Sequence, residues 1–476
     1  MPNGPDDGRI SRRLLLARGA VSGLGLWLLP SGLSARLSFG LEQGEGVKDD
    51  RRYLQAAVQA ARWLRSVQVK TADGLAWPVD PAKPEHIETD LYHGTSGVVL
   101  FFVEAYRSTG DESYLKDAQA GGEYLLSKLP KSGDDFDCGL YTGLSGVAFA
   151  LIEAGRYPGG ANHRGGSRRC IKLLKAKAVK KGAGVEWTPT TDIISGNAGI
   201  GLFLLYAARE IPDKSLVDLA AQAGRRLVEL GKPAGGGMKW AMNETFPRLM
   251  PNFSHGTAGV AYFLASLYRQ TREKAFLDAA VAGGTYLRSV ADTEGNACLI
   301  FHNEPDGKDL YYLSWCHGPA GTARLFYQLY RITNDKEWLE WVHKGARAVM
   351  RSGVPEKRTE GFWNNAGQCC GSAGVAEFFL NLYLSEGTWR AEYKEVSIRV
   401  ADDLLSRATK TDGGVKWVQA EHRVQPENLA AQTGYMQGAA GIGMLLLHMQ
   451  ALDSKRQWWR HVRFSDSPWA AASPIA

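Results

Sequence analysis

The sequence predicts an all-α fold: a double-layered toroid, or (α/α)7 barrel, built from seven repeats of a helix pair. Three observations lead to this fold class. A Gly-x-x-Gly element recurs seven times along the chain, a long apolar run follows each copy, and a charged amphipathic segment precedes each copy. Repeats that pair one polar helix with one apolar helix bury their apolar helices together when they close into a ring.

The glycine elements are spaced by about one helix pair. Successive copies begin 49 to 67 residues apart, which is room for two helices and their connections. One such element is weak evidence of a repeat, but seven in succession are not expected by chance. The copies are Gly94–Gly97, Gly143–Gly146, Gly196–Gly199, Gly256–Gly259, Gly318–Gly321, Gly371–Gly374 and Gly438–Gly441.

Each glycine element is predicted to open an inner helix. Segments such as Val98–Tyr106, Val260–Tyr268 and Val375–Tyr383 carry apolar or small residues on nearly every side, which is typical of a buried helix. The outer helices should carry their charges on one face. We expect them at Arg52–Val69, Tyr114–Leu129, Ser167–Lys180, Leu216–Leu230, Phe276–Val290, Trp338–Met350 and Tyr393–Ala408.

Two further features of the repeat lead to expectations about one rim of the toroid. A Gly-x-x-Trp loop recurs between the helices of a unit, as at Gly74–Trp77, Gly184–Trp187, Gly237–Trp240 and Gly414–Trp417, and should form short hairpins or turns. The paired glycines should let neighbouring inner helices approach closely and leave backbone N–H groups bare at the helix N-termini. The converging helix dipoles would then lower the pKa of nearby cysteine thiols.

The N-terminal residues 1–40 are expected to be an export signal outside the fold. Arg12 and Arg13 follow a serine and precede a mildly apolar stretch that ends at Pro30. This pattern is similar to a twin-arginine signal. The apolar run is short for a membrane span, so we expect an exported, periplasmic or extracytoplasmic protein without a transmembrane domain beyond an uncleaved signal. The toroid should occupy residues 50–452 and a C-terminal tail residues 453–476.

Composition and charge exclude nucleic acid as a partner. The chain has 476 residues, 44% of them hydrophobic, and a formal net charge of +6. It shows no Lys/Arg stripe interleaved with aromatic residues, which a nucleic-acid interface would need. The one basic cluster is interpreted as the solvated face of an outer helix; it comprises Arg168, Arg169, Lys172, Lys175, Lys177, Lys180 and Lys181.

The residues just before each glycine element differ between repeats, and they carry three cysteines. Cys316 lies in the fifth repeat, and Cys369 and Cys370 lie in the sixth, so a toroid should bring them together. Adjacent cysteines rarely bridge each other. Three thiolates with one open position fit a tetrahedral Zn²⁺ site of the catalytic kind, and we expect one zinc ion per chain. The alternative is three small cysteines that pack between helices. The other cysteines, Cys138, Cys170 and Cys298, are treated as structural.

With these residues the sequence resembles the lanthionine synthetase C-like family, the cyclases of lantibiotic biosynthesis and their relatives. The resemblance covers about residues 50–450 and implies an α/α toroid with a central zinc ion. The motifs that carry it are Ser314-Trp-Cys316-His317-Gly318, Cys369-Cys370-Gly371, Asn252-x-x-His255-Gly256 and Asp192-x-x-x-Gly196.

The resemblance also implies roles for individual residues. The family's zinc ligands fall on Cys316 and Cys369, with Cys370 at the position of a histidine ligand, as in a subgroup that uses three thiolates. His255 and Asp192 match the family's active-site histidine and aspartate. A third candidate, His317, stands where many members have tyrosine and would act as an acid/base or an orienting group. We expect structural roles for His93 and Gln437.

The implied reaction is a Michael-type addition that forms a thioether. A thiol, from a peptide cysteine or a small molecule, attacks the β-carbon of dehydroalanine or dehydrobutyrine in a peptide. An electron-rich zinc with three thiolates would leave the substrate thiolate nucleophilic. His255 would protonate the enolate carbon or accept the thiol proton, and Asp192 would orient or polarise its partner. The structural alternatives are a packed imidazole for His255 and a helix N-cap for Asp192.

Two other functions stay open at this stage. An exported α/α toroid can act on glycans, but that requires paired carboxylates at the rim, and only Asp192 is well placed. The chain can also be a non-catalytic module that binds zinc or a peptide without turnover.

Overall fold

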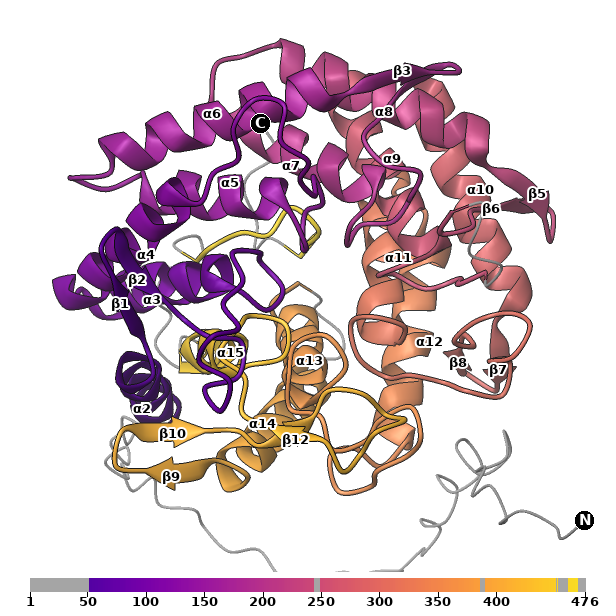
Figure 1. The fold of residues 1–476 in the computed structure, drawn as a ribbon. Helices are drawn as coiled ribbons and strands as arrows, with labels where there is room; N and C mark the ends of the chain where they lie inside the picture. Colours follow the sequence, from indigo (N-terminus) through magenta and orange to yellow (C-terminus); the bar gives the residue numbers. More distant parts are fainter. Residues whose placement is uncertain (1–50, 244–248, 386–389, 451, 453–460, 470–476) are drawn as a thin grey trace, which may run out of the picture.

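A computed structural model describes residues 51–243, 249–385, 390–450, 452 and 461–469. The expected export signal at residues 1–40 lies outside the described residues. Within them, fourteen α-helices alternate between an inner and an outer layer around a common centre (Figure 1). The predicted seven-fold α/α toroid is therefore confirmed. Among these helices, none combines the length and the hydropathy needed to cross a bilayer.

The inner layer consists of the seven helices that follow the glycine elements. These helices are nearly all buried along their length, as their apolar sequences predict. They are α3 (Thr95–Thr109), α5 (Leu144–Ala154), α7 (Asn197–Glu210), α9 (Thr257–Thr271), α11 (Pro319–Thr333), α13 (Ser372–Ser385) and α15 (Ala439–Gln450).

The outer layer consists of the amphipathic helices, each of which buries one face. They are α2 (Arg52–Ser66), α4 (Glu112–Ser127), α6 (Ala161–Lys177), α8 (Ser215–Leu230), α10 (Lys274–Val290), α12 (Lys336–Arg351) and α14 (Arg390–Ser406). Each outer helix packs against the inner helix that precedes it, and the first outer helix, α2, packs against the last inner helix, α15. This pairing of chain ends closes the ring.

Short antiparallel hairpins connect the layers, as predicted. Five of them are β1 (Val69–Thr71) with β2 (Gly74–Ala76), β3 (Val179–Lys181) with β4 (Gly184–Glu186), β5 (Lys232–Ala234) with β6 (Gly237–Lys239), β7 (Asp292–Glu294) with β8 (Ala297–Leu299), and β9 (Thr409–Thr411) with β10 (Gly414–Lys416). A sixth pair, β11 (Gln419–Ala420) with β12 (Leu429–Ala430), brackets a longer loop. The tryptophan of the Gly-x-x-Trp loop anchors its hairpin, since Trp77 Nε1 donates to Leu64 O (2.9 Å) on the preceding outer helix.

Two predicted helix ends were wrong because hairpins begin there. The helix expected at Ser167–Lys180 ends at Lys177, and Lys180 lies in β3; Val69, expected to end the first outer helix, lies in β1. The basic cluster is accordingly shared between α6 and β3. Arg168, Arg169 and Lys172 on α6 are exposed, in agreement with a solvated helix face.

The helix N-termini at the rim differ from the expectation of bare N–H groups. In six of the seven repeats the loop before the glycine element folds back over the first turn of the inner helix, and its carbonyl oxygen accepts the first helical N–H; the fifth helix begins at Pro319, which has no N–H. Thr257 N donates to Met250 O (3.2 Å), and Ser372 N donates to Asn365 O (3.2 Å). The loop backbone therefore caps these helices, and no bare donor is left at these positions to receive an anion.

The second glycine of each element makes room for that loop rather than for a neighbouring helix. A Cβ at Gly321 would lie 1.9 Å from the carbonyl oxygen of Trp315, and a Cβ at Gly441 would lie 1.8 Å from that of Tyr435. The same space touches the adjacent repeat, because a Gly321 Cβ would also lie 2.7 Å from Phe253 Cβ. The glycine thus lets the loop lie directly on its own helix and against the next repeat.

The C-terminal segment, residues 461–469, lies inside the ring of inner helices (Figure 1, yellow). Asp466 Oδ2 accepts from Trp315 Nε1 (3.1 Å) and from the Tyr141 hydroxyl (3.1 Å). Trp469 is buried and its ring lies 4.4 Å from that of Tyr327 on α11. Part of the segment that the sequence places in the tail therefore fills the toroid from within.

We predict that Gly321→Ala destabilises the protein, because the added methyl group must displace the Trp315 carbonyl. Overpacking of this kind costs about 1–3 kcal/mol, which should lower the midpoint of urea unfolding measured by circular dichroism. The matched control is Gly165→Ala on α6, where an added Cβ meets nothing within 4 Å and helix propensity favours alanine. Equal midpoints for the two variants would contradict this role of the glycine.

Candidate metal centre and acid/base pair

A ring of backbone hydrogen bonds runs around the rim and connects all seven repeats. In each repeat the residue two places before the first glycine takes part, and its N–H donates to the equivalent carbonyl of the next repeat, except that Ile193 donates in place of Ile194. The bonds are Tyr92 to Tyr141 (2.9 Å), Tyr141 to Ile194 (2.9 Å), Ile193 to Ser254 (3.4 Å), Ser254 to Cys316 (2.9 Å), Cys316 to Cys369 (3.0 Å), Cys369 to Met436 (3.0 Å) and Met436 to Tyr92 (2.9 Å). Two cysteines from adjacent repeats are therefore joined directly through their backbones.

The three cysteines expected to meet at the rim lie together in the structure. Cys316 Sγ is 3.1 Å from Cys370 Sγ, and Cys370 Sγ is 3.5 Å from Cys369 Sγ. Cys316 and Cys369 are buried, while Cys370 is partly exposed, and all three are free thiols. The sulfur atoms all lie within 4.8 Å of one another, so the group can hold a metal ion.

The chemistry of this donor set fits zinc. Two sulfur ligands about 2.3 Å from a tetrahedral zinc ion lie about 3.8 Å apart. The separations of 3.1 Å and 3.5 Å from Cys370 to the other two sulfur atoms are shorter than this. A ring of backbone bonds holds two of the three donors, so only small side-chain adjustments are needed to admit an ion. Because three cysteines leave one tetrahedral position unfilled, the site is of the open kind.

The three thiols differ in the direction in which their pKa values are shifted. Burial disfavours ionisation of Cys369, but hydrogen bonds from the Cys316 and Cys370 thiols and from the Tyr92 hydroxyl outweigh it and set the pKa of Cys369 well below its ordinary value. Burial raises the pKa of Cys316. The hydrogen bond with Cys316 lowers the pKa of Cys370, but the hydrogen bond to Cys369, together with burial and the charge of Cys369, outweighs it and raises that pKa well above its ordinary value. The expected lowering of thiol pKa values therefore occurs at one cysteine, and neighbouring hydrogen bonds, not bare helix N-termini, cause it.

Asp192 and His255 form a pair beside the thiols. Asp192 is fully buried; its Oδ2 lies 2.6 Å from His255 Nδ1. Its other oxygen accepts the backbone N–H groups of Ile194 (3.0 Å), Ser195 (2.9 Å) and Gly196 (2.9 Å). Since the carboxylate holds the proton on Nδ1, Nε2 of His255 is left for a substrate. Burial opposes the imidazolium, but the charge and hydrogen bond of Asp192 outweigh it and raise the pKa of His255.

His317 also lines the pocket, but its pKa is shifted in the opposite direction to that of His255. Its Nε2 is 3.4 Å from Ser254 Oγ, and its ring packs on those of His302 (4.3 Å) and Tyr312 (5.4 Å). Burial, together with the charges of His302 and His255, lowers the pKa of His317 well below its ordinary value. This imidazole is therefore neutral near pH 7, and it is a poorer proton donor than His255.

A pocket of about 240 Å³ opens beside the thiols. Residues from several loops and repeats line it, which are Tyr92, Ile194, Ser254, His255, Tyr312, Cys316, His317, Trp363, Cys369, Cys370, Glu421, His422, Arg423, Val424 and Gln437. The loop between β11 and β12 forms one wall of the pocket, and Val424 on this loop is 68% exposed. A substrate can therefore reach the thiols and His255 through one opening.

Two residues of this site, Tyr92 and Glu421, were not predicted from the sequence to be functional. The Tyr92 hydroxyl accepts from Gln437 Nε2 (3.1 Å) and stabilises the Cys369 thiolate. Tyr92 occupies the same repeat position as the two ring cysteines, so an alignment of the repeats would have found it. Glu421 Oε1 lies 3.0 Å from His93 Nε2, and it belongs to the β11–β12 loop, outside the glycine elements of the repeats.

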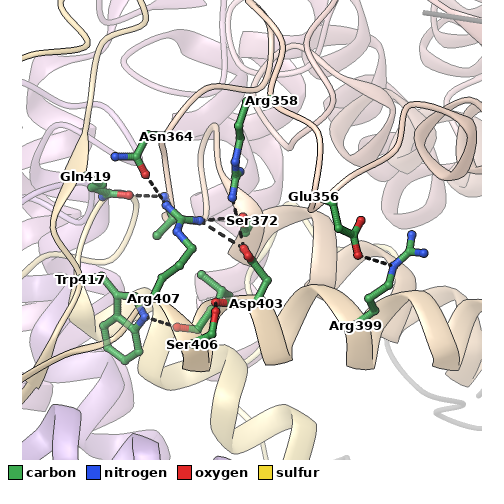
Figure 2. A network of polar contacts seen from close by, with 12 residues as sticks. Glu356, Arg358, Asn364, Ser372, Arg399, Asp403, Ser406, Arg407, Trp417 and Gln419 are labelled. Carbon is green, nitrogen blue, oxygen red and sulfur yellow. Dashed lines mark hydrogen bonds and ion pairs between the residues drawn. The ribbon is translucent and has the colours of Figure 1, made fainter.

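The turn that carries Cys369 and Cys370 is held to the outer layer by Arg407, which directly follows α14 (Figure 2). The Arg407 guanidinium donates to Asn364 Oδ1 (2.6 Å) and to Ser372 Oγ (3.3 Å). These two residues lie on either side of the cysteines in sequence. The Arg407 side chain therefore restrains both ends of the turn that carries two of the three thiols.

The remaining cysteines stand apart from the cluster. Cys138, Cys170 and Cys298 are buried, and burial raises the pKa of each thiol to about 12. Thiols that resist ionisation to this degree are inert packing residues.

Comparisons with known proteins identify the family of the chain and agree with its fold. The family described as lanthionine synthetase C-like protein matches residues 85–462. Among solved structures, nisin cyclase superposes with a TM-score of 0.58 at 16% identity, over 87% of this chain and 97% of the cyclase. An α-1,6-mannanase from Salegentibacter sp. HEL1_6 gives a TM-score of 0.46 at 16% identity, over 84% of this chain and 99% of the mannanase. At these identities the likeness to solved structures is one of fold.

We predict that Asp192→Asn lowers the pKa of His255, because the amide keeps the hydrogen-bonding shape but loses the charge. Histidine side-chain NMR, assigned with a His255→Gln variant, measures the titration. The raised pKa in the folded protein means that the pair stabilises the fold at low pH, and that this contribution is lost as the pH rises through the folded-state pKa. Asp192→Asn should remove that pH dependence.

The matched control is Asp278→Asn, which removes an exposed carboxylate that pairs with Lys274 on outer helix α10. This control should leave the titration of His255 unchanged. An unchanged His255 titration in Asp192→Asn would show that the two residues do not act as a pair.

Proposed function

The chain belongs to the lanthionine synthetase C-like family, and we propose that it is a zinc-dependent, cyclase-like enzyme that adds a thiol to a dehydrated residue of a peptide. The observation that carries the proposal is the meeting of three thiols and the Asp192–His255 pair around one pocket. A thioether-forming addition needs a deprotonated thiol and a proton for the α-carbon of the dehydrated residue. The thiol cluster would provide the site where the thiol is deprotonated, and the Asp192–His255 pair would provide the proton.

Cys316, Cys369 and Cys370 would hold one zinc ion. Bound there, the ion would lower the pKa of a substrate thiol and, with three thiolate ligands offsetting its charge, leave that thiolate nucleophilic. The protein's own contribution is to keep the three donors together. Three features hold the cysteines that provide these donors. They are the ring of backbone hydrogen bonds, the hydrogen bonds of Arg407 and the hydroxyl of Tyr92.

His255 would supply the proton that completes the addition. The thiolate sulfur forms a bond to the β-carbon of the dehydrated residue, and the electron pair of the carbon–carbon double bond moves to the α-carbon as an enolate. His255 Nε2 donates a proton to that carbon, and the proton released earlier by the thiol restores the imidazolium. Asp192 keeps Nδ1 protonated and favours the charged ring, so the acid persists at higher pH than an isolated histidine would allow.

The pocket favours a peptide substrate that presents a side chain inward. A volume of about 240 Å³ suits a few side chains rather than a whole peptide. Tyr312 and Trp363, whose rings lie 5.5 Å apart, line this pocket together with Arg423 and the exposed Val424. The remainder of a peptide would lie across the rim against these residues.

Export by the twin-arginine route is part of the proposal. This route carries folded proteins, so the zinc ion can be loaded before the protein leaves the cytoplasm. The substrate must then carry its dehydrated residue into the same compartment. The signal-like segment with Arg12 and Arg13 is the observation behind this part.

Glycan hydrolysis receives less support from the site. The usual glycosidase mechanism needs two carboxyl groups on either side of the scissile bond. Among the described residues that line the pocket, Glu421 is the single carboxylate, and it contacts His93 (3.0 Å) and Gln432 (2.6 Å). Asp192 is buried and engaged with His255. A non-catalytic binding module, the other alternative, differs from an enzyme in turnover alone, which the following assay measures.

We predict that the zinc-loaded protein accelerates ring closure in a peptide with one cysteine and one dehydroalanine. Loss of the free thiol, followed by alkylation and mass spectrometry, reports the reaction. Cys370→Ala should bring the rate to the uncatalysed background, because one of three ligands is lost. His255→Gln should lower the rate by about 10²–10⁴-fold, the usual contribution of a positioned acid.

The control variant is His86→Gln, which changes an exposed histidine outside the pocket and should keep the parent rate. A parent no faster than the peptide alone would favour the binding module over the enzyme. A parent rate in His255→Gln would remove the proposed acid and leave the thiol cluster as the whole site.

A further inference from the structure

A second cluster of metal-binding side chains lies inside the toroid, apart from the thiols. Glu104 on α3, Glu377 on α13 and His448 on α15 come from three neighbouring inner helices, and His461 comes from the C-terminal segment. Glu104 is the one charged side chain among the buried residues of α3. A carboxylate buried in an otherwise apolar helix strongly destabilises the fold unless its charge is compensated, so this residue needs a strong partner.

The side chains converge on one point. Glu104 Oε1 contacts His461 Nδ1 and lies 3.6 Å from His448 Nε2. One ligand atom from each of these three residues lies within 4.8 Å of the other two. The other oxygen of Glu104 accepts the backbone N–H of Val462 (2.7 Å). One carboxylate oxygen and two imidazole nitrogens thus face a common centre.

Glu377 orients the His448 ring so that Nε2 points to that centre. Its two carboxylate oxygens lie 3.0 Å and 3.1 Å from His448 Nδ1. This contact places a proton on Nδ1 and turns Nε2 toward Glu104 Oε1. A carboxylate behind a ligating histidine is the usual way in which proteins orient such a ligand and raise its basicity.

The position of His448 Nε2 is the geometric observation that supports a metal ion at this centre. This atom is buried and has no hydrogen-bond partner among the described residues. Its distance of 3.6 Å to Glu104 Oε1 is too long for a hydrogen bond. It is close to the spacing of about 3.3 Å between two N or O ligands of one tetrahedral zinc ion.

We propose that Glu104, His448 and His461 bind a second Zn²⁺ ion, with Glu377 orienting His448. Imidazole and carboxylate donors suit zinc, and this site contains no sulfur, unlike the one at the rim. Glu377, His448 and His461 also line an interior cavity of about 590 Å³, which gives water access to the remaining position. The proposal is independent of the catalytic function proposed above.

The ion would fix the C-terminal segment inside the ring. His461 is the one ligand that does not come from an inner helix, so binding would tie residues 461–469 to α3 and α15. Asp466 in this segment holds Trp315 Nε1 (3.1 Å), and Trp315 precedes the ligand candidate Cys316. Through Asp466 and Trp315, the second ion would therefore help to hold the residue next to Cys316 in place.

Zinc content of the full chain tests the proposal, with zinc alone as the probe. In a Cys316→Ala/Cys370→Ala background, which removes the thiol site, about one zinc per chain should remain after gel filtration. Adding His448→Gln should remove it, and adding His86→Gln should not. Cobalt bound in the same background should show no thiolate-to-cobalt charge-transfer band, because the site has no sulfur ligand.

A second variant protects the test against misfolding. If His448→Gln does not fold, Glu377→Gln keeps the shape of the second-layer partner and should weaken zinc binding by about 10–100-fold in a chelator competition. A zinc-free cysteine double variant, whose melting temperature does not change on addition of zinc, would overturn the proposal. The four side chains would then be an ion-pair network that anchors the C-terminal segment without a metal.

Discussion

Seven backbone hydrogen bonds that run from repeat to repeat around the rim are the constraint on which the site depends. The three consecutive residues before each glycine element have different structural roles. The carbonyl of the first lies on the second glycine of its own helix, as Trp315 lies on Gly321. The second residue makes the ring bond. The third lines the pocket in four repeats, as His255, His317, Cys370 and Gln437. Side chains from separate repeats therefore meet because their backbones are already joined.

The sequence was sufficient for the architecture and for the thiol cluster. Seven glycine elements with apolar and amphipathic partners fix the repeat, and a toroid then places Cys316 beside Cys369 whatever the loop lengths are. The sequence did not show where the loop backbone lies. N–H groups that were expected to be bare are capped by carbonyls seven residues earlier, because the loop folds back over the helix. For the same reason the ionisation of Cys369 depends on hydrogen bonds from its neighbours and from Tyr92.

Residues outside the repeat pattern were the hardest to predict. Glu421 belongs to the loop between β11 and β12, outside the glycine elements, and Glu104 and His448 are isolated polar residues in helices that otherwise indicate core. Their partners are distant in sequence, and His461 is contributed by a segment that looked like a tail. The cost of burying a charge in an apolar helix is the signal that a closer reading could have used. It predicts a partner, although it does not identify which residue provides it.

The central claim is that three thiols from two neighbouring repeats form one metal site at the rim. An anomalous difference map at the zinc absorption edge, from crystals of the zinc-loaded full chain, tests it directly and locates each ion. The account predicts a peak about 2.3 Å from the sulfur atoms of Cys316, Cys369 and Cys370, with the rim backbone bonds intact. No peak between these sulfur atoms, or a disulfide between Cys316 and Cys370 in the reduced protein, would contradict it.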